Sequence, residues 1–209
     1  MRRIQSLGFG TLLCTAFSAS ALAQTTVATA ANSDDRVLRT TGDTSGPKAS
    51  QPRAAQILID EAVKTAKANN KAVFVHFGAS WCGYCHMLDK FLSASEVSPV
   101  MAAHYVIVSL DVQEQGDKKA LENPGADSVM QATGVNGVPS FFFLDGQGKQ
   151  IASSMVMPPQ GDNMGFPALP EEIKMFDALL QKTAPRMTEG DRAKVGEYLT
   201  NTAKSLASH

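Results

Sequence analysis

Apolar residues are arranged along this chain in two patterns. One is the spacing typical of helices, and the other is the short continuous run typical of buried strands. Residues 53–68 carry their apolar side chains at helical spacing, on one face. Residues 72–77 (AVFVHF) instead form a short continuous apolar run, which is typical of a strand buried on both faces of a sheet. The same two patterns predict further helices at 82–92, 96–104, 126–133, 171–182 and 189–206, and further strands at 105–112, 140–144 and 150–155.

The order of these elements predicts the fold class. Strands and helices alternate first, and the last two strands are joined by 145–148 (DGQG), a hairpin sequence. We therefore expect an α/β fold with a central mixed sheet flanked by helices, and with an extra C-terminal helix. Residues 157–170 are rich in proline and glycine and should be irregular. The final amphipathic helix is expected to cover the core of its own domain rather than a second copy.

The first residues of the chain predict export. Arg2 and Arg3 precede an apolar stretch over 7–19, and small residues at 21 and 23 are typical of a signal peptide (1–23) cleaved after Ala23. The apolar stretch is shorter than the about 20 residues that span a bilayer, so a membrane anchor is the weaker interpretation. We expect a periplasmic protein with no membrane span in the mature chain.

The composition predicts one globular domain after a flexible leader. Residues 24–51 contain scarcely any large apolar side chain, so they should not form a core of their own. Residues 52–209 form the expected domain, and the chain as a whole is 44% hydrophobic and 19% charged. With a net charge of -1 and no dense run of Lys or Arg, nothing suggests a nucleic-acid partner.

The cysteines point to chemistry rather than to a structural framework. Cys14 is expected to leave with the signal peptide, so the mature chain keeps only Cys82 and Cys85. A disulfide that closes so short a loop removes little entropy from the unfolded chain, which makes stability a weak reason for its presence.

Two short motifs carry a family resemblance. Trp81-Cys82-Gly83-Tyr84-Cys85 follows the predicted strand 72–77 and opens a helix, and Gly137-Val138-Pro139-Ser140 precedes another strand. Together they resemble the thioredoxin superfamily, over roughly residues 72–155. The resemblance implies a thioredoxin-like fold, a cis peptide bond between Val138 and Pro139, and a thiol-disulfide oxidoreductase.

Each motif residue has an expected role under this resemblance. Cys82 lies at a helix N-terminus, which stabilises a thiolate, and is expected to attack a substrate. Cys85 is expected to resolve the mixed disulfide by forming the Cys82–Cys85 bridge. Pro139 has no N–H and leaves the neighbouring backbone open, so an extended polypeptide could pair beside it. We expect Trp81, Gly83, Tyr84 and Val138 to contact the substrate.

Two features refine this picture. His76 stands six residues before Cys82, where thioredoxins place a buried acid, and it is either a catalytic proton carrier or a core histidine. The Gly83-Tyr84 pair followed by His86 is closer to periplasmic disulfide isomerases, whereas residues 91–97 look like periplasmic reductase modules. The direction of electron flow stays open, with the reductase direction slightly favoured over an isomerase or oxidase.

Two alternatives belong to other classes of protein. Cys82-Gly83-Tyr84-Cys85-His86 spells the attachment pattern for c-type haem, although its place between a strand and a helix argues against that use. The thiolates, with histidines and Met155, Met157 and Met164, would also suit copper(I), but no spacing defines a site. The preferred reading needs no metal or cofactor, and its partners are protein substrates with thiols or disulfides and a redox partner protein.

Overall fold

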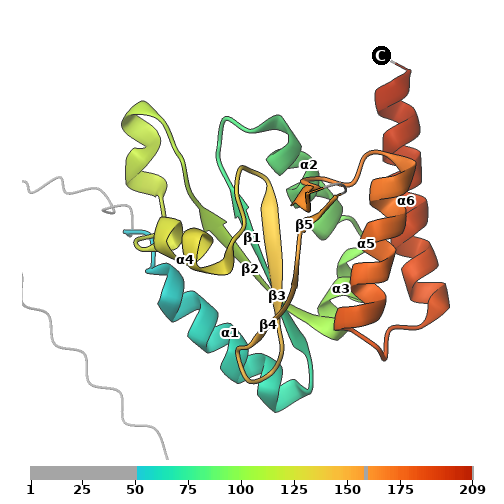
Figure 1. The fold of residues 1–209 in the computed structure, drawn as a ribbon, viewed down its shortest axis with the longest axis horizontal. Coiled ribbons are helices and arrows are strands. Elements are labelled where there is room, and N and C mark those ends of the chain that lie inside the picture. Colours follow the sequence, from blue (N-terminus) through green and yellow to red (C-terminus); the bar gives the residue numbers. More distant parts are fainter. Residues whose placement is uncertain (1–50, 158–159, 209) are drawn as a thin grey trace, which may run out of the picture. The chain divides into compact units, whose positions relative to one another are not determined.

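A four-stranded mixed sheet forms the centre of the domain in the computed structural model, which describes residues 51–157 and 160–208 (Figure 1). The strand order is β2-β1-β3-β4, with β1 parallel to β2 and antiparallel to β3, and β3 antiparallel to β4. The mixed sheet expected from the sequence is therefore confirmed. The strands are β1 (Ala72–Gly78), β2 (Tyr105–Asp111), β3 (Ser140–Leu144) and β4 (Gln150–Ser153).

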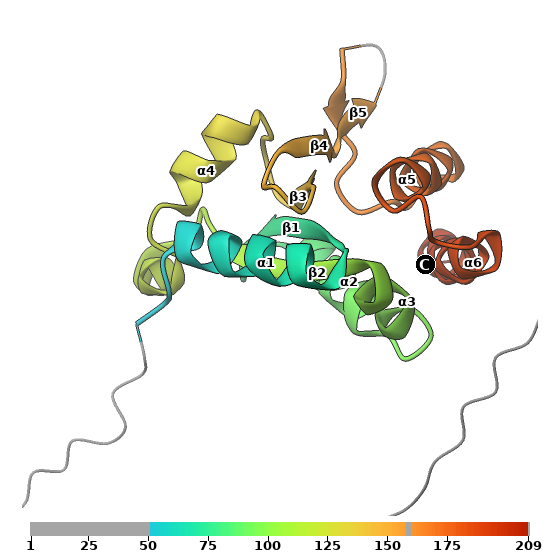
Figure 2. The same ribbon diagram turned by 90° about the horizontal axis from the view of Figure 1, so that it is seen from below.

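Helices cover both faces of this sheet, so the domain has three layers (Figures 1 and 2). Helices α1 and α4 pack on one face, and α2, α3, α5 and α6 pack on the other. The bounds are α1 (Ala55–Asn69), α2 (Gly83–Ser93), α3 (Ser98–His104), α4 (Ala126–Thr133), α5 (Pro170–Thr183) and α6 (Glu189–Ala207). No helix within the described ranges is long and apolar enough to cross a membrane.

Phenylalanines from adjacent strands fill the layer under α2 and α5. Alternate residues of a strand point to opposite faces, so Phe141 and Phe143 of β3 meet Phe74 of β1, while Phe142 faces α1 and α4. The Phe74 ring centroid lies 5.2 Å from that of Phe141 and 5.0 Å from that of Phe143. This packing anchors the strand before the cysteines to the strand after Pro139.

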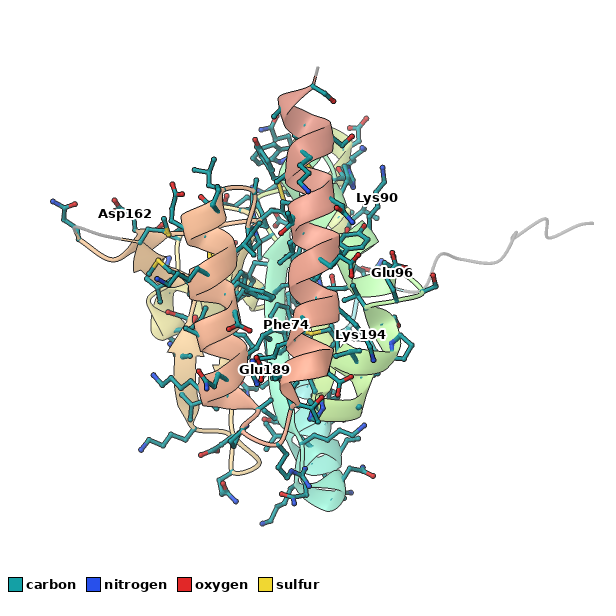
Figure 3. The ribbon with its side chains drawn as sticks, turned by 90° about the vertical axis from the view of Figure 1, so that its right-hand side faces the viewer. Phe74, Lys90, Glu96, Asp162, Glu189 and Lys194 are labelled. Atoms are coloured by element: carbon teal, nitrogen blue, oxygen red, sulfur yellow. A yellow bond between two sulfur atoms is a disulfide. The ribbon has the colours of Figure 1, made fainter. Side chains whose placement is uncertain are left out.

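The C-terminal helix α6 packs on its own domain, as expected. It runs beside α5 in Figure 3, buries Val195 and Leu199, and brings Tyr198 to 5.7 Å from Phe91 of α2, measured between ring centroids. The Thr188 hydroxyl oxygen accepts a hydrogen bond from the Asp191 N–H at 3.1 Å, which starts the helix at the predicted residue.

The structure differs from the sequence expectations at two connections. The expected strand 150–155 ends at Ser153 as β4, and a small antiparallel sheet of β5 (Met155–Met157) and β6 (Asp162–Asn163) follows, with β6 inside the segment 157–170 that was expected to be irregular. Part of the polar connection after β2 forms a short 3-10 helix, η1 (Gly116–Leu121). Both elements are too short to show a sequence period, and they lie beside the cysteines. The expected signal peptide and all but Gln51 of the expected leader lie outside the described residues.

Candidate functional site

The turn between β1 and α2 positions the two cysteines. Cys82 is the N-cap residue of α2, and Cys85 lies in its first turn. Their sulfur atoms form a disulfide, with the Cα atoms 5.2 Å apart. The Cys85 N–H donates to the Cys82 sulfur across 3.1 Å. The predicted disulfide pair is therefore present, and both residues are nearly buried, at 6% and 4% exposure.

The start of α2 favours negative charge on Cys82. The first turn of α2 contains no acidic residue, and the unpaired N–H groups of a helix N-terminus carry partial positive charge. A thiolate at the N-cap gains from both the dipole and the Cys85 N–H. The local structure therefore favours the thiolate form of a reduced Cys82.

The second motif lies against the first. The Val138–Pro139 peptide bond is cis, and Val138 packs on the small cluster formed by Ala79, Cys82 and Cys85. Gly137 adopts a φ of 66°, in the left-handed region that glycine tolerates best, which lets the chain turn before β3. The two motifs that carried the resemblance are therefore brought together.

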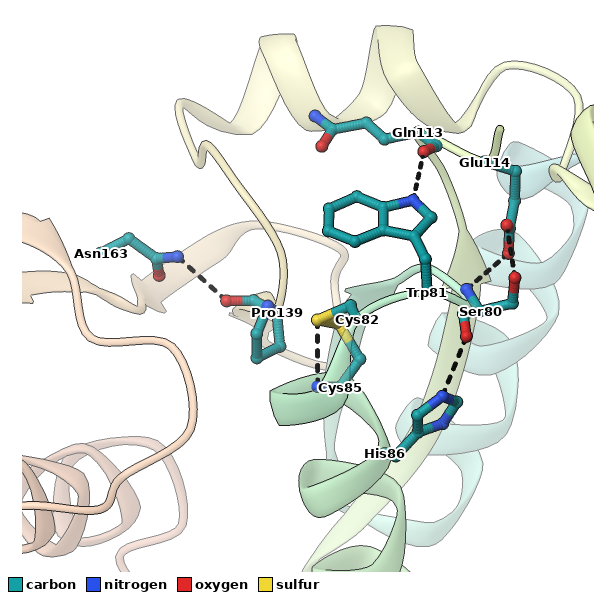
Figure 4. Close-up of a disulfide and its surroundings, with 9 residues drawn as sticks. All are labelled: Ser80, Trp81, Cys82, Cys85, His86, Gln113, Glu114, Pro139 and Asn163. Carbon is teal, nitrogen blue, oxygen red and sulfur yellow. Dashed lines mark hydrogen bonds between the residues drawn. A yellow bond between two sulfur atoms is a disulfide. The ribbon is translucent and has the colours of Figure 1, made fainter. Parts of the chain in front are cut away.

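The β5–β6 sheet holds the loop of Pro139 in place. Asn163 of β6 donates a side-chain hydrogen bond to the Pro139 carbonyl oxygen at 2.9 Å, as Figure 4 shows. Its side-chain oxygen accepts from the Gly165 N–H at 3.2 Å. Asn163 was not predicted, since no local sequence pattern indicates that this segment folds back to Pro139.

A groove of about 390 Å³ opens on this side of the disulfide. Tyr84 lines it from the CxxC segment, and Val138 and Pro139 line it from the second motif. Tyr84 is 55% exposed, so a bound polypeptide can reach it. The remaining lining residues follow β5 in sequence and were not predicted: Asn163, Met164, Gly165, Phe166, Ala168, Leu169 and Glu172.

A second, smaller cavity of about 210 Å³ lies on the other side of Cys85. Three of its lining residues, Asp89, Asp111 and Glu114, are acidic. Burial raises the pKa of Asp111, and the negative charges of Glu114 and Asp89 raise it further. The remaining lining residues are Gly78, Ala79, Ser80, His86, Ser109 and Leu121.

Glu114 supports the turn that carries the cysteines. Its two carboxylate oxygens accept hydrogen bonds from the N–H and the hydroxyl of Ser80, each at 2.7 Å (Figure 4). Burial raises the pKa of Glu114, but these hydrogen bonds outweigh it and the pKa is lowered. Asp111 is the last residue of β2, which is parallel to β1, and Glu114 follows three residues later, so a parallel pairing of the two predicted strands would have placed both beside the cysteines.

The histidine singled out by the sequence is buried within the sheet. His76 shares a face of β1 with Phe74, and their ring centroids are 6.1 Å apart. Burial lowers the pKa of His76 to about 4, although Asp89 opposes this effect, so the ring is neutral near neutral pH. His76 is not among the described residues that line the groove or the acidic cavity.

Trp81 and Gly83 lie at the surface beside the cysteines. Trp81 is 51% exposed, and its indole N–H donates to the Gln113 carbonyl oxygen at 2.8 Å, which fixes the ring over the turn (Figure 4). A side chain at Gly83 would meet no atom within 4 Å, so this backbone is open to a partner.

Comparisons with known proteins agree with this geometry. The model of the thioredoxin-like domain family matches residues 59–160. The chain contains a thioredoxin-like domain.

A protein named disulfide bond reductase DsbH from Chlamydia pneumoniae is 28% identical over 94 residues, which cover 44% of this chain and 57% of that protein. An uncharacterised protein of Caenorhabditis elegans, B0495.5, is 29% identical over 117 residues, 56% of this chain and 16% of the relative. The matches therefore span 57% or less of these relatives' lengths.

Solved structures similar to the thioredoxin-like domain include a disulphide isomerase from Xylella fastidiosa Temecula1. It is 20% identical with a TM-score of 0.43, and the match covers 79% of this chain and 98% of that one. A structure named DsbH oxidoreductase is also 20% identical, with a TM-score of 0.41, and the match covers 70% of this chain and 95% of that one.

The side chains that haem attachment or copper(I) binding would use are bonded to or packed against other residues of the thioredoxin-like domain. The two cysteine sulfurs are bonded to each other, and the His86 ring Nε2 is 3.0 Å from the Ser80 carbonyl oxygen. Met155 packs on the α1 side of the sheet, while Met157 and Met164 pack on the α2 side. The described residues contain no group of three or more His, Cys, Asp or Glu side chains arranged to hold a metal ion.

Proposed function

We propose that this protein is an exported thiol-disulfide oxidoreductase that acts on protein substrates through Cys82 and Cys85. The observation that carries the proposal is a cysteine pair, joined as a disulfide at the N-terminus of α2 and packed against Val138 before the cis proline. The thioredoxin-like domain and the DsbH relative, named as a disulfide bond reductase, support it.

In the reductase direction, the reduced domain transfers two electrons to a substrate disulfide. The Cys82 thiolate attacks one substrate sulfur, forming a mixed disulfide while the substrate S–S bond breaks and its other sulfur leaves as a thiolate. The Cys85 thiolate then attacks the Cys82 sulfur and releases the second substrate sulfur. The Cys82–Cys85 bridge remains, and the protons of the two cysteines end on the substrate thiols. A redox partner protein must reduce the bridge before the next cycle.

The neighbouring residues have supporting roles in this proposal. Trp81, Gly83 and Tyr84 form the surface around Cys82, and two of them are more than half exposed. The backbone at Val138 pairs with the substrate chain, since Pro139 offers no N–H there. In this proposal His76 is a neutral acceptor of the Cys85 proton, and the low pKa of its ring makes it a weak base.

The proposed location is the periplasm, with cleavage after Ala23. It rests on the positive charge, the apolar stretch and the small residues of 1–23, and on a cysteine pair that must exchange with a separate redox partner protein. Mass spectrometry of the protein purified from a bacterial periplasmic fraction should give a chain that begins at Gln24. A chain that still begins at Met1 would contradict export by cleavage.

The decisive experiment measures the dithiol–disulfide equilibrium of the purified domain in glutathione buffers. A potential near about -270 mV supports the reductase direction, and one near about -120 mV supports an oxidase that donates its disulfide. An intermediate value, near about -180 mV, supports an isomerase. The Cys82→Ser variant should exchange no disulfides, and exchange retained in that variant would contradict the proposal.

A further inference from the structure

The groove beside Pro139 has a composition that selects among substrates. Its floor is apolar, because Met164 and Phe166 line it and are each only 4% exposed. Leu169 also lines it and is 50% exposed, so a partner can reach its side chain. Leu169 and Tyr84 together give the groove apolar surface that is exposed in the described part of the chain.

The charged side chain at the groove is already hydrogen-bonded within the domain. Glu172 is the one acidic or basic side chain among the described lining residues. Its Oε2 atom accepts hydrogen bonds from the N–H groups of Ala168 and Leu169, at 2.8 and 2.9 Å. One oxygen of this carboxylate therefore closes the first turn of α5. A charged partner side chain would lose hydration beside the apolar side chains of the groove.

The groove is held at a fixed place relative to the cysteines. Asn163 donates to the Pro139 carbonyl oxygen at 2.9 Å, and the Met164 N–H donates to the Ser154 carbonyl oxygen at 2.8 Å. Ser154 is fully buried, and its own N–H donates to the Phe141 carbonyl oxygen of β3 at 2.8 Å. The segment after β5 is therefore attached to the same strand that follows Pro139.

From these observations we propose that Leu169, over the floor of Met164 and Phe166, is a specificity-determining residue that selects protein segments with a large apolar side chain next to the reacting cysteine. The proposal rests on the proposed function and narrows its substrate class. Because Tyr84 lies between Cys82 and Cys85 in sequence and lines the groove, a substrate sulfur at Cys82 brings its neighbouring residue here. The volume of about 390 Å³ accommodates such a side chain with its adjoining backbone.

The test compares short peptide disulfides that differ only at the residue beside the cysteine: Leu, Ala, Lys or Asp. We expect kcat/KM for the Leu peptide to exceed that for the Ala peptide by about tenfold, and the Lys and Asp peptides to be no better than Ala. In Leu169→Asp the ratio of Leu to Ala should fall to about one, because a carboxylate in the groove opposes apolar burial.

Ile57→Asp is the matched control, since Ile57 is 51% exposed on α1 and is not part of the groove. It should keep the wild-type ratio. Circular dichroism of both variants checks that they fold. Equal rates for the Leu and Ala peptides in the wild-type protein would overturn the inference, and so would an unchanged ratio in Leu169→Asp. If the protein still exchanges with hydroxyethyl disulfide in these cases, the proposed function stands. No exchange with any disulfide would overturn both.

Discussion

The two sides of the Cys82–Cys85 disulfide differ in chemistry although both belong to one small site. Figure 4 shows Pro139 and Asn163 on one side, and Ser80, His86 and Glu114 on the other. The first side is an apolar groove whose single carboxylate is already hydrogen-bonded. The second is a smaller cavity lined by three acidic side chains.

This difference suggests a division of work between the two cysteines. The groove has room for a polypeptide beside the CxxC segment, while the acidic cavity touches Cys85 and controls its electrostatic environment. Negative charges near a thiol disfavour the thiolate, so the acidic cavity should keep a reduced Cys85 in its thiol form. The side that recognises a partner and the side that tunes the resolving thiol are thus separate.

The largest effect should come from the cysteines themselves. Cys85→Ala should capture substrates as long-lived mixed disulfides on Cys82, because the sulfur that borders the acidic cavity is missing and only slow attack by outside thiols releases them. Cys82→Ala should capture almost none. Non-reducing gel electrophoresis after mixing with an oxidised protein substrate measures both. Capture by Cys82→Ala equal to that by Cys85→Ala would mean that the two cysteines do not have these roles.

His76 should make the domain less stable in acid. Its folded pKa of about 4 lies below the ordinary 6.5, so the unfolded chain binds more protons between these values, and stability rises with pH through that window. The wild-type protein should lose about 2–3 kcal/mol of unfolding free energy between pH 6.5 and pH 4 from this residue. Urea unfolding at several pH values measures it, and His76→Phe should flatten the curve. A His76→Phe variant with an unchanged pH slope would show that the ring is not neutral when buried.

Removing the Glu114 carboxylate should lower the free energy of unfolding by an amount similar to or smaller than the His76 effect. Glu114→Ala leaves the Ser80 N–H and hydroxyl without their acceptor, at a cost of about 1–3 kcal/mol in unfolding free energy. Chemical denaturation measures this, with Asp117→Ala on the exposed η1 as the control. If the two variants were equally stable, Glu114 would not hold the turn.

The smallest expected effect belongs to Asp111. Its raised pKa, caused first by burial and then by Glu114 and Asp89, means that its charge opposes folding above that pKa. Asp111→Asn should therefore gain a few tenths of a kcal/mol, about 0.5 at most, at pH 7 and nothing at low pH, since the residue is partly solvated. The same change should favour the thiolate of a reduced Cys85, observed as faster thiol alkylation in a Cys82→Ser background.

The exposed Glu197→Gln on α6 is the control for this charge change. It should alter neither the pH dependence of stability nor the rate of Cys85 alkylation. Equal effects of Asp111→Asn and Glu197→Gln would show that the acidic cavity does not act on Cys85.

Much of the fold could be predicted from local pattern. The runs 72–77 and 140–144 are continuous and apolar because these strands are covered on both faces, and they appear as β1 and β3 with nearly the same bounds. Thr188 marks the start of α6 because a helix cap depends on neighbouring residues. The β5–β6 sheet was missed because two-residue and three-residue strands carry no period.

The sequence by itself determined the order of strands and helices along the chain, the cysteine pair at a helix start and the proline motif, because periodicity and short motifs are local properties. Only the tertiary structure decided what surrounds the disulfide. Asn163 reaches Pro139 across 24 residues, and Glu114 reaches Ser80 across 34. Such contacts depend on how strands and loops pack together, and no spacing along the chain records them. The apolar groove and the acidic cavity are therefore products of the fold.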